Sequence, residues 1–210
     1  MLDAAGDGCL AALVVAGRVV AERRAAGGRG QAAQLAVMAG DVLAEAGPFD
    51  LVAVTVGPGS FTGLRGAIAL AHGLALGAGC PVVGVSVAEA LAEAVPPTGR
   101  LLWVALDNRR GRVFLDIAGE AAVWPLDGLP RPSGPVAIAG DRANEVAAWL
   151  AAQGGDVMLS RHVVPCALEV ASVGLRRWAG ALADLPVRPL YVEQPEARLP
   201  AGGLRPGPTG

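Results

Sequence analysis

The chain has 210 residues, of which 53% are hydrophobic, and this excludes an intrinsically disordered protein because one large core or two smaller ones can form. Its 17 basic and 19 acidic residues give a net charge of −2, which excludes a nucleic-acid binder that acts through a strong overall positive field. Cys9, Cys80 and Cys166 stand far apart and form no CxxC pair, so neither a disulfide framework nor a thiolate metal site is expected.

The first half of the chain alternates strand patterns with helix patterns. The expected elements are strands at 10–15 and 18–22 joined by Ala16-Gly17, a helix at 31–46, a buried strand at 51–56, a helix at about 60–77 and a strand at 82–85. Ser86 with Glu89 three residues later predicts a capping box at the start of a further helix. This order is typical of a parallel sheet with helical crossovers.

A boundary is expected at Pro96-Pro97-Thr98-Gly99, because two prolines and a glycine end a helix and permit a hinge. We therefore predict a domain at 1–98, a second domain at 99–199 and a disordered Gly/Pro-rich tail at 200–210. The second domain should contain strands at 101–106, 112–117 and 136–139 and helices at 142–153 and 166–183. Its order is compatible with a second copy of one β-β-β-α-β-α plan.

The segment LVAVTVGPGSFTGLR, residues 51–65, is the most informative part of the sequence. A buried strand runs into Gly57-Pro58-Gly59 and then into Ser60 at a helix start. Two interpretations stay open. The glycine-lined turn could present backbone N–H groups to an anion, or it could be a tight turn with Ser60 as the helix cap. The spacing matches neither common nucleotide-binding glycine motif.

The helix that follows has almost no polar face, which is typical of a helix buried on all sides. Gly66, Gly73 and Gly77 gather on one side of it, and helix glycines cost ~1 kcal/mol each relative to alanine. They favour the close approach of another backbone, which belongs either to the same chain or to another subunit. A membrane span is not expected, because His72 and the turn ending in Pro81 interrupt the uncharged stretch 66–88.

Catalytic constellations are sparse. His72 and His162 are ninety positions apart and form no HxxxH pair, so we expect no helix-borne metal site and no catalytic residue. Asp107, Arg109 and Arg110 mark a polar turn, which is either a solvated loop or a contact for phosphate or for a partner carboxylate. No secretory signal is visible, and a cytoplasmic location is expected.

Several segments resemble the TsaB family, also called YeaZ. The run GPGSFTGLRGAIALAHGLAL followed by PVVGVSVAEAL, residues 57–91, looks like the family's hallmark. The segments RGQAAQLAVMAGDVLAEAG, LDNRRGRVF and PLYVEQPEARLP are similar to its first helix, its second-domain hairpin and its closing segment. The similar segments follow one another in the family's order.

The resemblance implies a two-lobed α/β fold of the actin-like ATPase (ASKHA) type, with mixed sheets flanked by helices. It implies a non-catalytic scaffold subunit, without metal or cofactor of its own, in the complex that forms N6-threonylcarbamoyladenosine on tRNA. The implied partners are the catalytic TsaD, the ATPase subunit TsaE and, through the complex, tRNA. Binding of ATP or ADP at a boundary between subunits stays open. The implied pairing surface comprises Gln31, Leu35, Met38, Val42, Phe61, Thr62, Arg65, Gly66, Ala69 and Gly73.

Actin-like proteins keep a phosphate-loop aspartate at the position that Asp3 occupies. Here Ala4 and Ala5 follow it in place of hydroxyl residues, and two residues precede it where the family has a full strand. A nucleotide or anion loop made of Asp3, Gly57, Gly59 and Ser60 stays open on this basis. Two alternatives also stay open: an active kinase or peptidase-like enzyme of the same superfamily, and a homodimer that uses the same helix surface.

Overall fold

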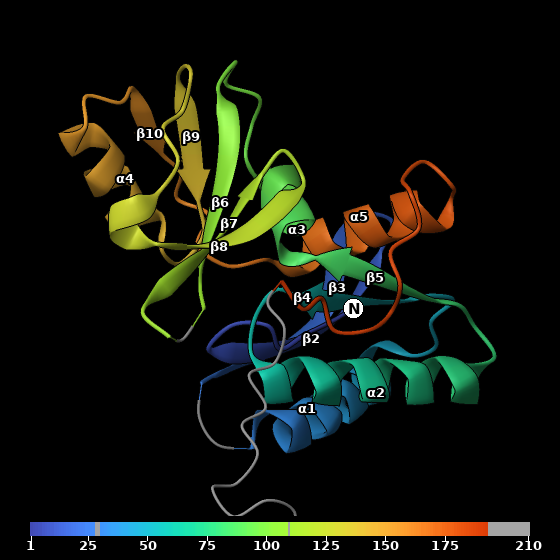
Figure 1. Cartoon of the computed structure of the whole chain (residues 1–210). Helices are drawn as coiled ribbons and strands as arrows, with labels where there is room; N and C mark the ends of the chain where they lie inside the picture. The colour runs from blue at the N-terminus through green and yellow to red at the C-terminus, as the bar shows by residue number, and fades with distance from the viewer. Residues whose placement is uncertain (28–29, 109, 193–210) are drawn as a thin grey trace, which may run out of the picture.

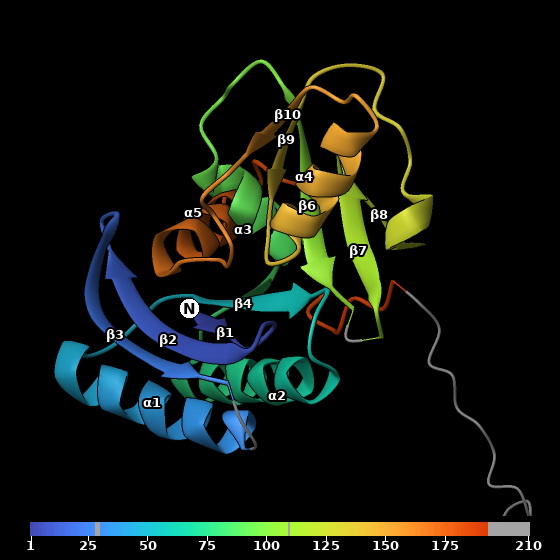
Figure 2. The same cartoon turned by 90° about the vertical axis from the view of Figure 1, so that its left-hand side faces the viewer.

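The computed structural model of the chain describes residues 1–27, 30–108 and 110–192. It contains two five-stranded mixed sheets, one built from the first half of the chain and one from the second. Figures 1 and 2 show the two sheets one above the other, each with helices on its faces. Among the described residues no helix combines the length and the apolar character that a membrane span requires.

The first sheet has the strand order β3-β2-β1-β4-β5. Its strands are β1 (Leu2–Asp3), β2 (Gly8–Val15), β3 (Arg18–Ala26), β4 (Val52–Gly57) and β5 (Val82–Ser86). β1 pairs antiparallel with β2 and parallel with β4, so the two-residue β1 joins a hairpin to a parallel pair. Every residue of β4 is buried, as its continuous apolar pattern predicts for a strand covered on both faces.

Helices cover both faces of the first sheet. α1 (Gln31–Ala46) and α2 (Phe61–Ala78) lie side by side on one face, while α3 (Val87–Ala94) and α5 (Ala167–Trp178) lie on the other (Figures 1 and 2). The Ser86 hydroxyl accepts from the N–H of Glu89, whose carboxylate accepts from the N–H of Ser86, so the predicted capping box is present.

The second sheet repeats the plan of the first with the order β10-β9-β6-β7-β8. Its elements are β6 (Leu101–Asp107), β7 (Arg112–Ile117), β8 (Glu120–Pro125), the 3₁₀ turn η1 (Leu126–Gly128), β9 (Val136–Ala139), α4 (Ala143–Ala152) and β10 (Val157–Leu159). In both sheets three antiparallel strands are followed by two parallel ones. The predicted α/β fold of two lobes with mixed sheets is confirmed.

The chain returns to the first sheet at its described end. α5 packs against β2, β4 and β5 and against α3. Residues 182–191, which we name the C-terminal strap, follow it, and Leu185, Val187 and Leu190 pack against the core of the first lobe. The predicted division at 98/99 stays a prediction, and the predicted tail at 200–210 lies outside the described residues.

Arg177 of α5 contacts three other parts of the chain, which are β5, α3 and the start of the strap. Its side chain is 6% exposed. The guanidinium donates to the carbonyl oxygens of Ala183 at 2.7 Å and Gly84 at 2.6 Å, and it also pairs with the carboxylate of Glu89. Burial raises the pKa of Glu89, but the hydrogen bonds from Arg177 and Ser86 outweigh it, so this pKa is lowered. Arg177 therefore links α5 to β5, α3 and the start of the strap.

Candidate functional site

The outward surface of α1 and α2 is the first candidate site. We define the helix face by nine of the exposed residues of these helices, which are Ala33, Val37, Gly40 and Ala44 on α1 and Thr62, Arg65, Ala69, Gly73 and Leu76 on α2. The exposed polar residues Gln34, Asp41, Glu45 and His72 lie outside this set. Val37 is 66% exposed and Leu76 is 85% exposed. The other residues are small apart from Thr62 and Arg65. An apolar, small-residue surface on two adjacent helices suits close packing against another polypeptide.

The predicted pairing residues separate into three groups by their exposure. Phe61, Thr62, Arg65, Ala69 and Gly73 are exposed on α2, so a partner can reach them. Gln31, Met38 and Gly66 are half-buried.

Leu35 and Val42 require a correction. They are 0% and 3% exposed and belong to the core of the first lobe. The family resemblance placed these residues in the pairing surface, but the apolar stripe to which they belong faces the chain's own sheet. Residues displaced by half a turn, such as Val37, occupy the outward side instead.

The glycines of α2 also differ from one another. A Cβ atom at Gly66 would lie 2.4 Å from the Cβ of Ala32, so the backbone that approaches Gly66 belongs to the same chain. A Cβ atom at Gly73 or at Gly77 would meet nothing within 4 Å, and both glycines are exposed. Close approach by the same chain therefore explains Gly66. Close approach by another subunit stays a prediction for Gly73 and Gly77.

This difference predicts opposite stability effects of alanine. Gly73→Ala should raise the free energy of unfolding by ~0.5–1 kcal/mol, because it removes a helix glycine without a steric cost. Gly66→Ala should lower it by ~1–3 kcal/mol, because the new methyl group overlaps Ala32. Urea unfolding of both variants checks the pair, and equal effects would contradict the same-chain contact.

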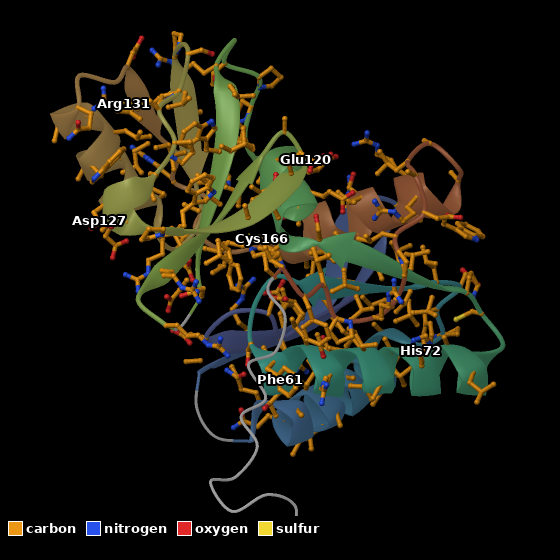
Figure 3. The ribbon with its side chains drawn as sticks, viewed as in Figure 1. Phe61, His72, Glu120, Asp127, Arg131 and Cys166 are labelled. Carbon is orange, nitrogen blue, oxygen red and sulfur yellow. The ribbon has the colours of Figure 1, made fainter. Side chains whose placement is uncertain are left out.

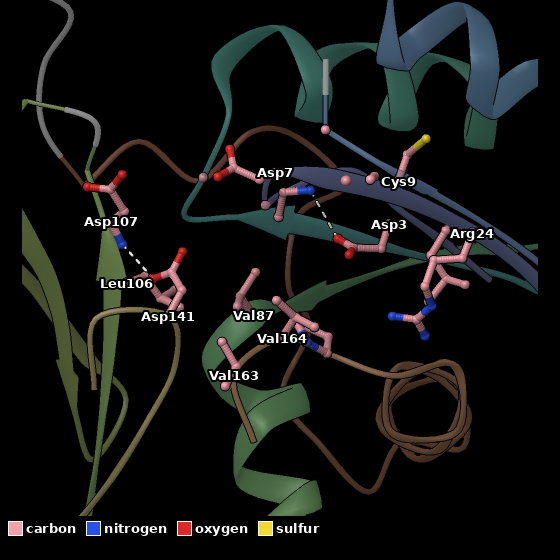
Figure 4. A pocket seen from close by; sticks show the side chains of 18 of the residues that line it. Asp3, Asp7, Cys9, Arg24, Val87, Leu106, Asp107, Asp141, Val163 and Val164 are labelled. Carbon is pink, nitrogen blue, oxygen red and sulfur yellow. Dashed lines mark hydrogen bonds between the residues drawn. The ribbon is translucent and has the colours of Figure 1, made fainter. Parts of the chain in front are cut away.

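The second candidate site is a cavity of about 420 Å³ between the two lobes, shown in Figure 4. Its lining carries more acidic than basic groups and has one apolar wall. The acidic residues are Asp3, Asp7, Asp107 and Asp141, the basic residue is Arg24, and the apolar wall includes Val87, Leu106, Val163 and Val164. Such a lining disfavours a polyanion, since the carboxylates repel it.

Asp3 lies at the end of β1 with its carboxylate in internal hydrogen bonds. Its Oδ1 accepts from the N–H of Ala5 at 3.0 Å and from the Thr55 hydroxyl. Burial raises the pKa of Asp3, and these hydrogen bonds counteract the shift only in part. On the opposite wall, Asp141 accepts from the N–H of Asp107 at 2.8 Å, and burial raises the pKa of Asp141 as well.

The start of α2 is closed by contacts within the chain. The Ser60 hydroxyl accepts from the N–H of Gly63, and the N–H of Ser60 donates to the carbonyl oxygen of Ala5 at 2.7 Å. A Cβ atom at Gly59 would lie 2.2 Å from that same oxygen. Ser60 thus acts as the helix cap, and its N–H does not face the cavity as an anion donor.

The four residues of the predicted nucleotide or anion loop are accordingly divided. Asp3 and Gly59 line the cavity, whereas Gly57 and Ser60 do not. Binding of a nucleotide or anion by this loop stays a prediction. His72 lies on α2 and His162 in the segment before α5. In the described ranges no group of three or more His, Cys, Asp and Glu side chains is arranged to hold a metal ion.

The raised pKa of Asp3 predicts a specific pH dependence. The folded chain binds this proton more tightly than the unfolded chain, so the stability contribution falls as pH rises above the ordinary value of 3.8. Asp3→Asn keeps the acceptor for Ala5 and Thr55 without the charge. The variant should be more stable than the wild type at pH 8, with a difference that shrinks toward pH 4. Guanidinium unfolding across this range measures it, and a constant difference would contradict the prediction.

Two residues of interest were not singled out from the sequence. Arg177 carried no signal, because it stands beside Arg176 inside the helix predicted at 166–183 and no pattern marks one of the two arginines as buried. Tyr191 stands inside the segment PLYVEQPEARLP, yet only the fold places it beside α2, where its hydroxyl accepts from Arg65 Nε at 3.0 Å.

Comparison with known proteins connects this geometry to a family. Residues 13–120, which are 108 of the chain's 210, match the model described as "TsaD: tRNA N6-adenosine threonylcarbamoyltransferase". A tRNA N6-adenosine threonylcarbamoyltransferase from Paracoccus denitrificans is 33% identical over 142 residues, which are 56% of this chain and 40% of that protein. The tRNA threonylcarbamoyladenosine biosynthesis protein TsaB from Escherichia coli is 43% identical over 60 residues, 28% of this chain and 26% of that protein. The chain thus spans less than half the length of these two relatives.

Solved structures agree with the sequence matches. YeaZ from Pseudomonas aeruginosa superposes with a TM-score of 0.68 and 28% identity, over 90% of this chain and 97% of that one. A further structure, described as an uncharacterized protein with similarity to peptidase YEAZ from Pseudomonas aeruginosa, gives a TM-score of 0.70 at 27% identity and covers 91% and 97% of the two chains. The chain therefore belongs to the family that the TsaD model describes, and within it to the TsaB (YeaZ) members.

Proposed function

We propose that this chain is a non-catalytic subunit in the formation of N6-threonylcarbamoyladenosine on tRNA and that it binds the catalytic TsaD subunit through the helix face. The observation that carries the proposal is the helix face itself, where Leu76 and Val37 are exposed beside a side-chain-free strip at Gly73. The names of the Paracoccus and Escherichia relatives supply the reaction.

The contacts at the cavity between the lobes favour a non-catalytic role over an enzymatic one. Asp3 is engaged by Thr55 and Ala5, and the start of α2 is closed by Ser60. The groups with which an actin-like kinase would hold phosphate are thus occupied by contacts within the chain. The alternative, an active kinase or peptidase-like enzyme, would require this loop to open.

The same proposal covers the remaining partners. TsaE and tRNA would join through the complex, and ATP or ADP would bind at a boundary between subunits. The isolated chain would hold no cofactor of its own, and the complex would work in the cytoplasm. A homodimer through the helix face is the competing assembly, because two copies could also bury Leu76 and Val37.

Three measurements test the proposed function. Depletion of this protein should reduce threonylcarbamoyladenosine in tRNA, measured by mass spectrometry of digested tRNA, and normal levels would overturn the role. The purified chain should co-elute with TsaD from the same organism at micromolar concentration and should not hydrolyse ATP alone. Turnover by the isolated chain would favour the enzyme alternative, and self-association without TsaD binding would favour the homodimer.

A further inference from the structure

The C-terminal strap lies along the side of α2 that α1 leaves uncovered. The carbonyl oxygen of Val187 is 3.2 Å from Nε2 of His72, and the N–H of Leu190 donates to the carbonyl oxygen of Val56 at 2.7 Å. The side chains of Leu185, Val187 and Leu190 are packed inward. α2 is therefore held between α1 and the strap, and its outward side stays exposed.

The strap carries Tyr191 to the first turns of α2, where it completes a cluster with Phe61 and Arg65. The Tyr191 hydroxyl accepts from Arg65 Nε at 3.0 Å, and Arg65 Cζ lies 3.8 Å from the centre of the Phe61 ring. The two aromatic rings are 6.0 Å apart and tilted by 35°. Figure 3 labels Phe61 at the start of α2 and His72 farther along it, which marks the stretch that the strap follows.

These contacts fix one orientation of the Arg65 guanidinium. Stacking on Phe61 and the hydrogen bond to Tyr191 restrict a side chain that otherwise has many rotamers, so less entropy is lost when a partner binds. Within the described residues the Nη atoms of Arg65 have no hydrogen-bond partner. Phe61 is 51% exposed and Tyr191 is 46% exposed. Aromatic residues and arginine are the types that dominate the binding energy of protein interfaces.

We propose that the cluster of Phe61, Arg65 and Tyr191 anchors the partner subunit, with Tyr191 as a positioning residue that aims Arg65 at an acidic side chain of that partner. The inference rests on the proposed function and adds the strap to its binding surface. A carboxylate fits the two Nη atoms of a guanidinium in a bidentate pair.

A protein carboxylate is favoured over RNA phosphate for two reasons. The cluster is continuous with the helix face, in which Thr62, Ala69 and Gly73 suit protein packing. RNA binding through phosphate requires several cations, whereas the helix face and the strap together expose two arginines, Arg65 and Arg188, and the chain carries a net charge of −2.

The experiment measures the dissociation constant for TsaD of the full chain and of four variants by biolayer interferometry. Arg65→Gln should weaken binding at least ~10-fold, and Tyr191→Phe, which keeps the ring and removes the acceptor, should weaken it ~3–10-fold. The double variant should bind as Arg65→Gln does, because Tyr191 acts through Arg65. Arg161→Gln, an exposed arginine remote from the helix face, is the matched control and should bind as the wild type does.

Several outcomes separate the possibilities. Melting temperatures should stay equal among the isolated chains, since a purely structural role of Tyr191 would lower them instead. If the wild type binds TsaD and the Arg65 and Tyr191 variants bind equally well, this inference falls and the proposed function stands. If the wild type does not bind, both fall. Loss of tRNA affinity in Arg65→Gln with unchanged TsaD binding, measured by fluorescence anisotropy, would assign the cluster to RNA and overturn the proposal.

Discussion

Replacing Arg177 with alanine is expected to lower the free energy of unfolding by ~2–4 kcal/mol. The substitution removes the donors that satisfy the carbonyl oxygens of Gly84 and Ala183, and it leaves the Glu89 carboxylate partly buried without its cation. The value lies below the ~3–5 kcal/mol typical of a broken buried ion pair, because Glu89 is 36% exposed and solvent screens part of the charge. Guanidinium unfolding at pH 7 measures the loss.

The neighbouring arginine provides the control for Arg177. Arg176 pairs with Glu93 at 2.8 Å, but its side chain is 50% exposed, so Arg176→Ala should change stability by less than ~1 kcal/mol. The effect of Arg177→Ala should also depend on pH. The pair stabilises the fold fully above the ordinary Glu89 pKa of 4.5, and its contribution is lost as pH falls through the lowered folded-state value. Equal losses in the two variants would show that burial of Arg177 contributes nothing.

Placing tryptophan at Gly73 is expected to weaken binding of TsaD at least ~100-fold while the isolated chain stays folded. A Cβ atom at this exposed position meets no atom of its own chain within 4 Å, so a larger side chain can extend into solvent and the isolated chain is expected to fold. In the complex it would separate the two polypeptides at the point where they approach most closely. Analytical size exclusion with TsaD shows whether the complex forms.

A tryptophan elsewhere distinguishes loss of the interface from general damage. Ala148 is exposed on α4 of the second lobe, and Ala148→Trp should leave TsaD binding unchanged. Unchanged binding by Gly73→Trp would place the interface away from this part of α2. If Gly73→Trp disrupts self-association of the isolated chain instead, the homodimer becomes the better assignment.

Elements with a strong periodic pattern could be predicted well. The helix at 31–46 and the strands at 112–117 and 136–139 match the structure residue for residue. Each is long and regular or is bounded by breakers such as Gly47 and Gly140. The strand at 51–56 and the capping box at Ser86 were also predictable, because a buried parallel strand and a helix start each have a local signature.

Short and edge elements could not be predicted, because pairing with neighbours decides them. β1 has two residues and β10 has three, which is too few for a period to show. β8 ends in Pro125 and contains two alanines, and its pairing with β7 makes it a strand. α5 was expected to run to residue 183 but ends at Trp178, where Gly180 adopts a φ of 75° and its N–H bonds back to Arg177.

For the candidate site, too, local patterns could be predicted from the sequence and long-range contacts could not. The family resemblance placed the pairing surface on two helices, which stays a prediction, and it included buried residues of α1, because one apolar stripe can face either a core or a partner. Leu35 and Val42 turned out to be core residues. The contact of Tyr191 with Arg65 spans 126 positions, and no local pattern reports a contact of that range.

The return of α5 and the strap to the first sheet determines when each lobe can form during synthesis on the ribosome. The second lobe is continuous, with a core drawn from residues 103–157, so it can fold once that stretch has emerged. On one face of the first sheet α3 is made early, but the cover is complete only after Ala167–Trp178 has been made, and Tyr191 arrives later still. The contacts of Phe61, Arg65 and Tyr191 with one another therefore cannot be complete in a nascent chain before Tyr191 has been made.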